Sequence, residues 1–380
     1  MISKMEITNF LPAPVDEWLA GWREPVIEPD LPIVDPHHHL WHRKGWRYED
    51  SELLNDILDG HSIRSTVFIQ CREQYRTQGP EVLKPVGETE YVLKIAMEAQ
   101  RKVEKLLDAV KLSSNKSNKE KIFNNTHEIE LFPPHPDLKI CEAIVGFADL
   151  THGGDIVPAL ESHISIAQNR FRGIRHVGAR YEAPGFSNSM PLPPEGLFQQ
   201  PNFRNGFSYL KKYDLSFEAW VFQSQLNEVY SLAKDFPDTP IVINHVGGPL
   251  GVGIFADHKD RTFNSWKNAI SKLSLCPNVS LKLGGLGMVT CGFGLNQLSQ
   301  PPSSEILMNI WSPWINHCIE EFSPARCMFE SNFPVDKTSC SYRVLWNTFK
   351  RLSRGYSTSE RMNLFSGTAC KFYKLSSIKD

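Results

Sequence analysis

Eight short apolar runs, separated by longer stretches with helical spacing, most restrict how this chain can fold. The runs are Ile33–Asp35, Thr66–Ile69, Ala143–Phe147, Phe171–Arg175, Leu215–Ala219, Ile241–Asn244, Val279–Leu283 and Cys327–Phe329. Strands that alternate with helices indicate parallel β-α-β units. Eight such units in one chain favour a closed (β/α)8 barrel, the TIM barrel, over an open doubly wound sheet.

The stretches between the strands have the spacing of amphipathic helices. From Val92 to Val110, and again over 226–236 and 304–322, apolar residues recur on one face of a 3.6-residue period. Two segments lie outside this alternation: a leader with several prolines at residues 1–30 and a polar Ser/Asn/Lys tract at residues 111–137. The tract has too little apolar surface to offset the entropy of ordering it, so we expect a flexible insertion without a catalytic role. The predicted barrel covers residues 31–380.

Charge and apolar content exclude several classes of function. The 41 Lys and Arg residues against 43 Asp and Glu leave a net charge of −2, so no bulk field attracts nucleic acid or a membrane. No apolar run reaches the about 20 residues of a transmembrane helix, and Asp16 and Glu17 interrupt any apolar signal segment. The eight cysteines form no CxxC pair. We therefore expect a cytoplasmic protein with reduced cysteines that binds a small molecule; a homo-oligomer stays open.

Three consecutive histidines follow the first predicted strand. Side chains alternate along an extended segment, so His37 and His39 face one side and His38 the other. Two imidazoles in this spacing suit a zinc-like ion. Taken alone, the cluster could equally consist of hydrogen-bonded core and loop histidines. Its position favours a site, because TIM-barrel active sites lie at the carboxyl ends of the strands.

Polar residues also follow four other predicted strands. Each one by itself is better explained as a helix cap, a loop hydrogen bond or a satisfied core residue. Together with the first histidines they place five polar strand ends at one rim, which indicates an active site there. These residues are Gln70 and Arg72, Arg175 and His176, His245, and finally Asn332 and Asp336.

Several segments carry a resemblance to a known family: Val34–Trp41, Thr66–Glu88, Phe171–His176, Asn244–Gly251, Leu281–Met288 and Arg326–Asp336. They resemble the amidohydrolase-related family of TIM-barrel hydrolases, whose members include sugar lactonases and the pyrone-dicarboxylate lactonase. The resemblance covers nearly the whole chain apart from the leader and the polar tract. It implies that His37, His39 and His245 correspond to the strand-one and strand-six histidines of the family site.

Two positions depart from the family pattern. Asn332 stands where relatives often carry a strand-eight Asp, and Gln223 stands where close relatives carry a histidine after strand five. A carboxamide cannot accept a proton as a general base, and it is a poorer metal ligand than a carboxylate or an imidazole. Some lactonases of the superfamily work without a metal. We therefore predict that His37, His39 and His245 hold zinc or manganese weakly, or that the chain is metal-independent.

The predicted reaction is the opening of a lactone of a small carboxylate or sugar acid by activated water. The three histidines hold the water, with Asn332 orienting water or substrate by hydrogen bonds. The candidate general bases are His176, Glu330 and Asp336, which the sequence does not rank. Charge-assisted hydrogen bonds from Arg175 and Arg72 would hold a carboxylate or oxyanion. The candidate substrate-binding residues are Gln70, Arg72, Arg175, Gln223 and Asp336.

Two other classes of function stay open. A metal-dependent decarboxylase on a related barrel would make the chain a lyase. A barrel that binds a metabolite without turnover is favoured by the changes at Asn332 and Gln223. An assay can distinguish the three classes. A hydrolase releases acid, a lyase releases carbon dioxide, and a binder is thermally stabilised by its ligand without turnover.

Overall fold

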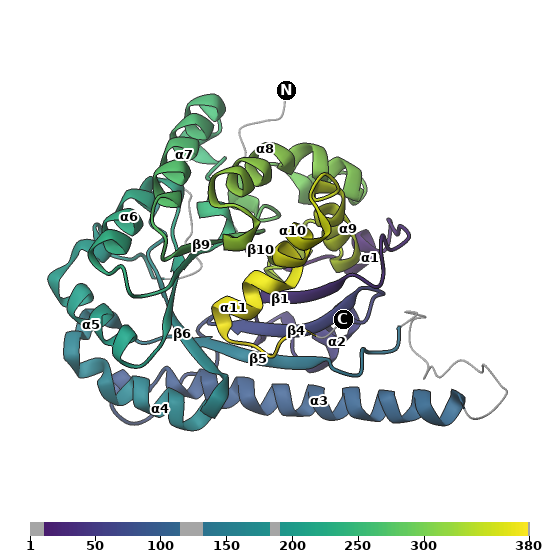
Figure 1. The fold of residues 1–380 in the computed structure, drawn as a ribbon, viewed down its shortest axis with the longest axis horizontal. Helices are drawn as coiled ribbons and strands as arrows, with labels where there is room; N and C mark the ends of the chain where they lie inside the picture. The colour runs from purple at the N-terminus through teal and green to yellow at the C-terminus, as the bar shows by residue number, and fades with distance from the viewer. Residues whose placement is uncertain (1–10, 115–131, 183–190, 379–380) are drawn as a thin grey trace.

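The computed structural model describes residues 11–114, 132–182 and 191–378, in which eight parallel strands follow one another around a sheet in chain order (Figure 1). All eight strands predicted from the sequence are confirmed. They are β1 (Pro32–His38), β4 (Ser62–Ile69), β5 (Lys139–Gly146), β6 (Phe171–Val177), β7 (Ser216–Trp220), β8 (Ile241–Ile243), β9 (Val279–Leu283) and β10 (Cys327–Phe329).

The sheet curves round until its first strand meets the segment after its last strand. The backbone N–H of His39 donates to the carbonyl of Phe333 at 2.8 Å, and the N–H of Asn332 donates to the carbonyl of His37 at 2.8 Å. A parallel bridge joins His38 to Phe333. The strands therefore form a nearly closed barrel, and the seam lies at the first histidines.

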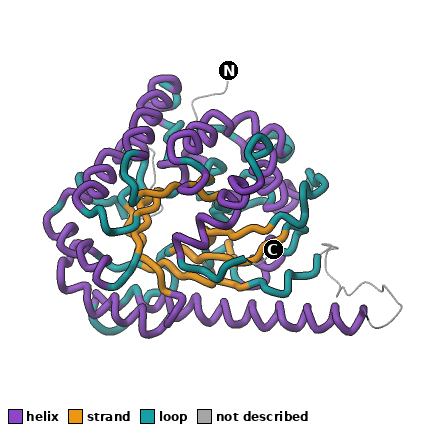
Figure 2. Tube along the Cα trace, in the orientation of Figure 1, coloured by secondary structure: helices purple, strands orange, loops and turns teal. Residues whose placement is uncertain are grey.

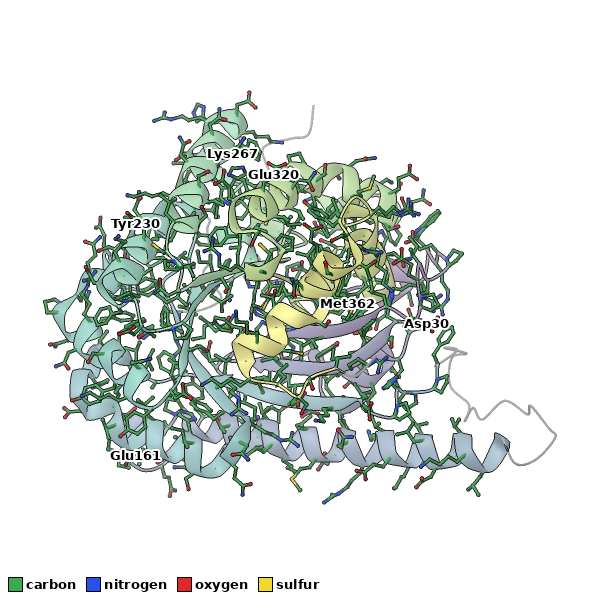
Figure 3. The ribbon with its side chains drawn as sticks, in the orientation of Figure 1. Asp30, Glu161, Tyr230, Lys267, Glu320 and Met362 are labelled. Atoms are coloured by element: carbon green, nitrogen blue, oxygen red, sulfur yellow. The ribbon has the colours of Figure 1, made fainter. Side chains whose placement is uncertain are left out.

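Helices surround the barrel on its outside (Figure 2). Serine caps fix the start of three of them, because Ser303 accepts the N–H of Ile306, Ser341 that of Val344 and Ser357 that of Glu360. Glu161 and Glu320 are exposed on the outer helices (Figure 3). The α-helices are α1 (Asp16–Leu19), α2 (Asp50–Ile57), α3 (Val86–Ser114), α4 (Val157–Ala167), α5 (Pro201–Lys212), α6 (Leu226–Asp235), α7 (Lys259–Ser274), α8 (Ser304–Phe322), α9 (Tyr342–Leu352), α10 (Thr358–Met362) and α11 (Thr368–Tyr373).

The apolar core has two main parts. The larger part lies between the strands and the surrounding helices, and the smaller one fills the barrel interior with inward-facing residues such as Val67 and Val242. Ala369 and Tyr373 of α11 belong to the smaller part, and Arg172, near the start of β6, donates to the carbonyl of Tyr373 at 2.8 Å. Because α11 covers the amino ends of the strands, the carboxyl ends are left for polar side chains.

The structure adds to the sequence expectations at several places. Helix α3 continues to Ser114, so the first residues of the polar tract are helical, whereas residues 115–131 lie outside the described residues. A hairpin of β2 (Trp41–Arg43) and β3 (Trp46–Tyr48), which the sequence did not indicate, follows the histidines. None of the eight cysteines, all of them described, forms a disulfide. No helix in the described ranges is long and apolar enough to cross a membrane.

Candidate active site

Three histidines predicted from the sequence converge at the carboxyl ends of the strands. His37 lies near the end of β1, His39 follows that strand, and His245 follows β8. The ring centroid of His37 lies 4.9 Å from that of His39 and 4.6 Å from that of His245. All three are at most 3% exposed. The barrel therefore brings together side chains that are more than 200 positions apart in the chain.

Two glycines make the close packing around His245 possible. A Cβ atom on Gly285, which has a left-handed φ of 70°, would lie 2.5 Å from the side chain of His245. A Cβ on Gly284 would lie 2.4 Å from the backbone oxygen of Glu330. Distances this short are excluded for carbon atoms, so only glycine at 284 and 285 allows β9 to approach His245 and Glu330.

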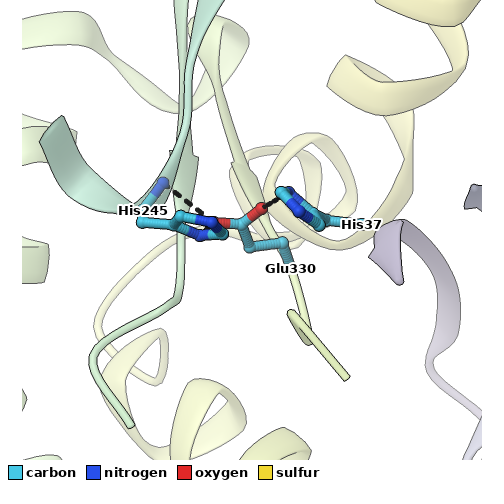
Figure 4. Close-up of side chains that lie close together, drawn as sticks. All are labelled: His37, His245 and Glu330. Carbon is cyan, nitrogen blue, oxygen red and sulfur yellow. Dashed lines mark hydrogen bonds and ion pairs between the residues drawn. The ribbon is translucent and has the colours of Figure 1, made fainter. Parts of the chain in front are cut away.

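Glu330, which directly follows β10, lies between His37 and His245 (Figure 4). Its Oε1 accepts the backbone N–H of His245 at 3.0 Å and lies 2.8 Å from Nδ1 of the same residue. Its Oε2 lies 2.5 Å from Nδ1 of His37 and has no other partner among the described residues. A fully buried carboxylate therefore joins the two histidines, whereas the sequence analysis named Glu330 only as one of three candidate bases.

Burial favours the neutral form of the three imidazoles. Burial is the main cause that holds the pKa of His37 and of His39 well below the usual value. The cation Arg175 lowers both pKa values further, and Lys282 also lowers that of His37. Burial also lowers the pKa of His245, although Glu330 opposes this shift. Nδ1 of His39 lies 2.7 Å from the carbonyl of Ile69, which can only accept a hydrogen bond. Nε2 of His39 therefore carries a lone pair.

Arg175 is fixed beside the histidines by its own hydrogen bonds. Its Nε donates to Oε1 of Gln70 at 3.1 Å, one terminal nitrogen donates to the carbonyl of Gln70, and the other lies 3.3 Å from Nε2 of His37. Each guanidinium nitrogen thus has a partner, and the residue is 2% exposed. Gln70 and Arg175, two of the predicted substrate-binding residues, therefore lie beside the histidines, where Gln70 accepts the hydrogen bonds that hold Arg175.

A second buried ion pair, which the sequence analysis missed, lies beneath His37. Nζ of Lys282 in β9 lies 2.9 Å from Oε2 of Glu218 in β7, donates to the carbonyl of Pro36 at 2.8 Å, and lies 3.3 Å from Nδ1 of His37. Glu218 also accepts hydrogen bonds from Asn244 and from Tyr373 of α11. The sequence could have indicated this pair, because Glu218 and Lys282 each interrupt a predicted apolar strand. A charged side chain buried inside a barrel needs a partner of opposite charge there.

A pocket of about 500 Å³ is lined by Gln70, the residue that accepts hydrogen bonds from Arg175 beside the histidines. Arg72 and His176 line it together with Phe147, Asp149 and apolar residues that include Leu192 and Leu197. The ring of His176 packs against Phe147, with centroids 5.0 Å apart, and burial lowers the pKa of His176 to about 4. The structure therefore places Arg72 and His176 in the wall of this pocket and not within the histidine cluster.

The remaining predicted residues make contacts outside the histidine cluster. The side-chain amide of Asn332, which has a φ of 54°, donates to Oδ1 of Asp336 at 2.8 Å. Oδ2 of Asp336 accepts the N–H of Gly287 at 3.0 Å, and burial raises the pKa of Asp336 to about 8. Oε1 of Gln223 accepts the N–H of Leu250 at 2.7 Å. Asn332 and Asp336 thus pair with each other, and Gln223 braces the loop after β8.

The donor set fits a divalent ion. Ligand atoms of His37, His245 and Glu330 all lie within 4.8 Å of one another. The buried Oε2 of Glu330 adds the anionic oxygen that Asn332 does not offer, and neutral imidazoles with a carboxylate are ligands typical of zinc. His39 is the neighbour of this group, whereas the sequence analysis had placed it among the ligands.

A barrel with buried histidines and a carboxylate at the carboxyl ends of its strands has its polar cluster where TIM-barrel enzymes have their active sites. Comparison with known proteins gives the family. The model of a family described as Amidohydrolase matches residues 124–375. The chain belongs to the amidohydrolase family.

Similarity to individual relatives covers more of the chain than the family model does. An uncharacterized protein, y4mH, of Sinorhizobium fredii is 30% identical over 364 residues, 91% of this chain and 99% of the relative. An L-fucono-1,5-lactonase of Burkholderia multivorans is 26% identical over 61% of this chain and 71% of its own length. An amidohydrolase of Burkholderia multivorans, at 20% identity, has crystal structures with bound HEPES (TM-score 0.62) and bound zinc (TM-score 0.60). Each covers 90% of this chain and 99% of the other, and supports the fold.

Proposed function

We propose that this chain hydrolyses lactones of small hydroxy acids at the cluster of His37, His245 and Glu330. The observation that carries the proposal is the pair of His245 and Glu330. A carboxylate 2.8 Å from Nδ1 of a buried imidazole holds the N–H there and leaves the lone pair on Nε2, which can then accept a proton. The names of two relatives, L-fucono-1,5-lactonase and L-rhamnono-gamma-lactonase, support a lactone as the substrate.

Residues of the chain can carry out each proton transfer of the proposed hydrolysis. Nε2 of His245 accepts a proton from water as the water oxygen bonds to the lactone carbonyl carbon. Arg175, fixed by Gln70, stabilises the negative charge that develops on the carbonyl oxygen. When the ring C–O bond breaks, the leaving alkoxide takes the proton back from His245, and the product is an open hydroxy acid. Glu330 stabilises the imidazolium between these steps.

His37, His245 and Glu330 would hold a divalent ion, with zinc or manganese as the expected metals. The proton transfer through Nε2 of His245 describes the protein without the ion, because one lone pair cannot bind a metal and accept a proton at the same time. When bound, such an ion would polarise the carbonyl and lower the pKa of water toward about 7. The contacts with Lys282 and Arg175 place two cations next to His37. This local positive charge favours weak metal binding.

A panel of neutral and carboxylated lactones tests the proposal, with acid release followed by pH-stat and carbon dioxide followed in parallel. The protein is assayed after chelation and after addition of zinc or manganese. We expect acid release, and we expect His245→Gln to lower kcat/KM by about 100-fold or more, the contribution of a general base. The matched control is His258→Gln, a change at an exposed histidine. Carbon dioxide release, or ligand-induced stabilisation without acid release, would support the lyase or the binder instead.

A further inference from the structure

The loop after β4 holds one arginine in an unusual backbone conformation. Arg72 has a left-handed φ of 67°, which a side chain other than glycine rarely adopts, and Gln74 two residues later has a φ of 49°. Arg72 is exposed, whereas its neighbours Cys71 and Glu73 are buried. A conformation of this kind persists only when the surrounding contacts hold it.

Glu88 in the first turn of α3 supplies two of those contacts. Its Oε1 accepts the N–H of Cys71 at 2.9 Å and the N–H of Glu73 at 2.8 Å, so one buried oxygen holds the backbone on both sides of Arg72. The carbonyl of Cys71 accepts from Arg43 at 2.7 Å. The carbonyl of Gln70 accepts from Arg175. The loop is therefore fixed before any ligand arrives.

The side chain of Arg72, in contrast to its backbone, is not held by the protein. Its guanidinium makes no hydrogen bond or ion pair with any described residue, although it lines the pocket beside Gln70. Asp149, the acidic residue of the same pocket, accepts from the N–H and the hydroxyl of Thr151 and has no ion pair with Arg72. Arg175 has all its guanidinium nitrogens engaged. Arg72 is thus the cation of this pocket whose donors are open to a ligand.

We infer that Arg72 binds an anionic group of the substrate and that Glu88 is the positioning residue that presents it. The inference rests on the proposed function, which it narrows: the preferred lactone carries a carboxylate remote from the reacting carbonyl. The carboxylate forms charge-assisted hydrogen bonds with Arg72. The lactone ring extends past Gln70 toward the histidines, and Phe147 and Leu192 contact its apolar edge.

Binding of a non-reacting anion tests the inference without turnover. The probes are glutarate and its neutral diamide, glutaramide, measured by calorimetry with the full chain. We expect wild type to bind glutarate at least tenfold more tightly than glutaramide, and Arg72→Gln to abolish this difference. Glu88→Ala should weaken glutarate binding by about 10-fold, and Glu88→Gln, which keeps an acceptor oxygen for both N–H groups, should restore most of it. Arg76→Gln, at a half-buried arginine paired with Glu90, is the matched control.

Kinetics separates positioning from a general structural effect. With δ-valerolactone and its 6-carboxylate derivative, Arg72→Gln and Glu88→Ala should raise the KM of the carboxylate more than the KM of the neutral lactone. Equal glutarate binding by wild type and Arg72→Gln, or no preference for glutarate in wild type, overturns the inference, and neither result depends on whether Glu88→Ala folds. A preference for glutarate without lactone turnover would retain the inference and reject the proposed hydrolysis.

Discussion

Replacing Glu330 by Gln removes the buried negative charge that joins the two histidines while it keeps the side-chain volume. One amide oxygen can maintain the bonds to the backbone and ring of His245, but the NH2 group then faces Nδ1 of His37, where Oε2 now lies at 2.5 Å. The nearby cations Lys282 and Arg175 also lose an anion, because the carboxylate of Glu330 contributes to the local field of both.

The size of the effect follows from the contacts that are lost. A hydrogen bond to a charged group contributes about 1.5–3 kcal/mol, and about 1.4 kcal/mol corresponds to a factor of ten in rate. We therefore expect Glu330→Gln to lower kcat/KM for a lactone by about 10- to 100-fold. Because Glu330 is also one of the three proposed metal ligands, the same change should weaken zinc binding.

The assay compares lactone hydrolysis by pH-stat and zinc binding for wild type, Glu330→Gln and Glu330→Asp, with circular dichroism as a check on folding. Glu321→Gln is the matched control, because Glu321 lies 3.9 Å from Nδ1 of His317 on the outside of the barrel. A folded Glu330→Gln variant with kcat/KM within twofold of wild type would refute the assigned role of Glu330.

Three further expectations follow from the same geometry. Burial raises the pKa of Asp336 from 3.8 to about 8, so between these pH values the unfolded chain binds fewer protons than the folded protein. The free energy of unfolding should therefore fall as the pH rises from about 4 to 8. Urea titrations should show a flatter pH dependence of this free energy for Asp336→Asn than for wild type. Gly285→Ala places a Cβ 2.5 Å from His245 at a φ of 70°, so it should lower both kcat and the melting temperature; unchanged values would contradict the packing argument. Zinc should leave the protein during dialysis against a chelator because cations flank His37, and stoichiometric zinc that survives prolonged dialysis would show tight binding instead.

The local sequence was enough to determine the barrel. Each strand is a short apolar run and each helix has a 3.6-residue apolar period, so both signals lie within a few residues of one another. Because parallel strands of a barrel all end at one rim, the positions of His37, His39, Arg175 and His245 after their strands predicted their proximity, and the structure brings their side chains together. The hairpin of β2 and β3 was not predicted, since its two strands are only three residues long.

Tertiary structure alone decided which side chains pair inside the barrel. The sequence places Asn332 and Glu330 two positions apart after the same strand, and nothing local shows that Asn332 turns to Asp336 while Glu330 contacts His37 and His245. The pair of Lys282 and Glu218 joins β9 to β7, and Glu88 holds a loop 15 residues earlier in the chain. Such pairs depend on the register and closure of the barrel, which bring together atoms from distant segments, and a charge pattern along one segment does not specify its partner.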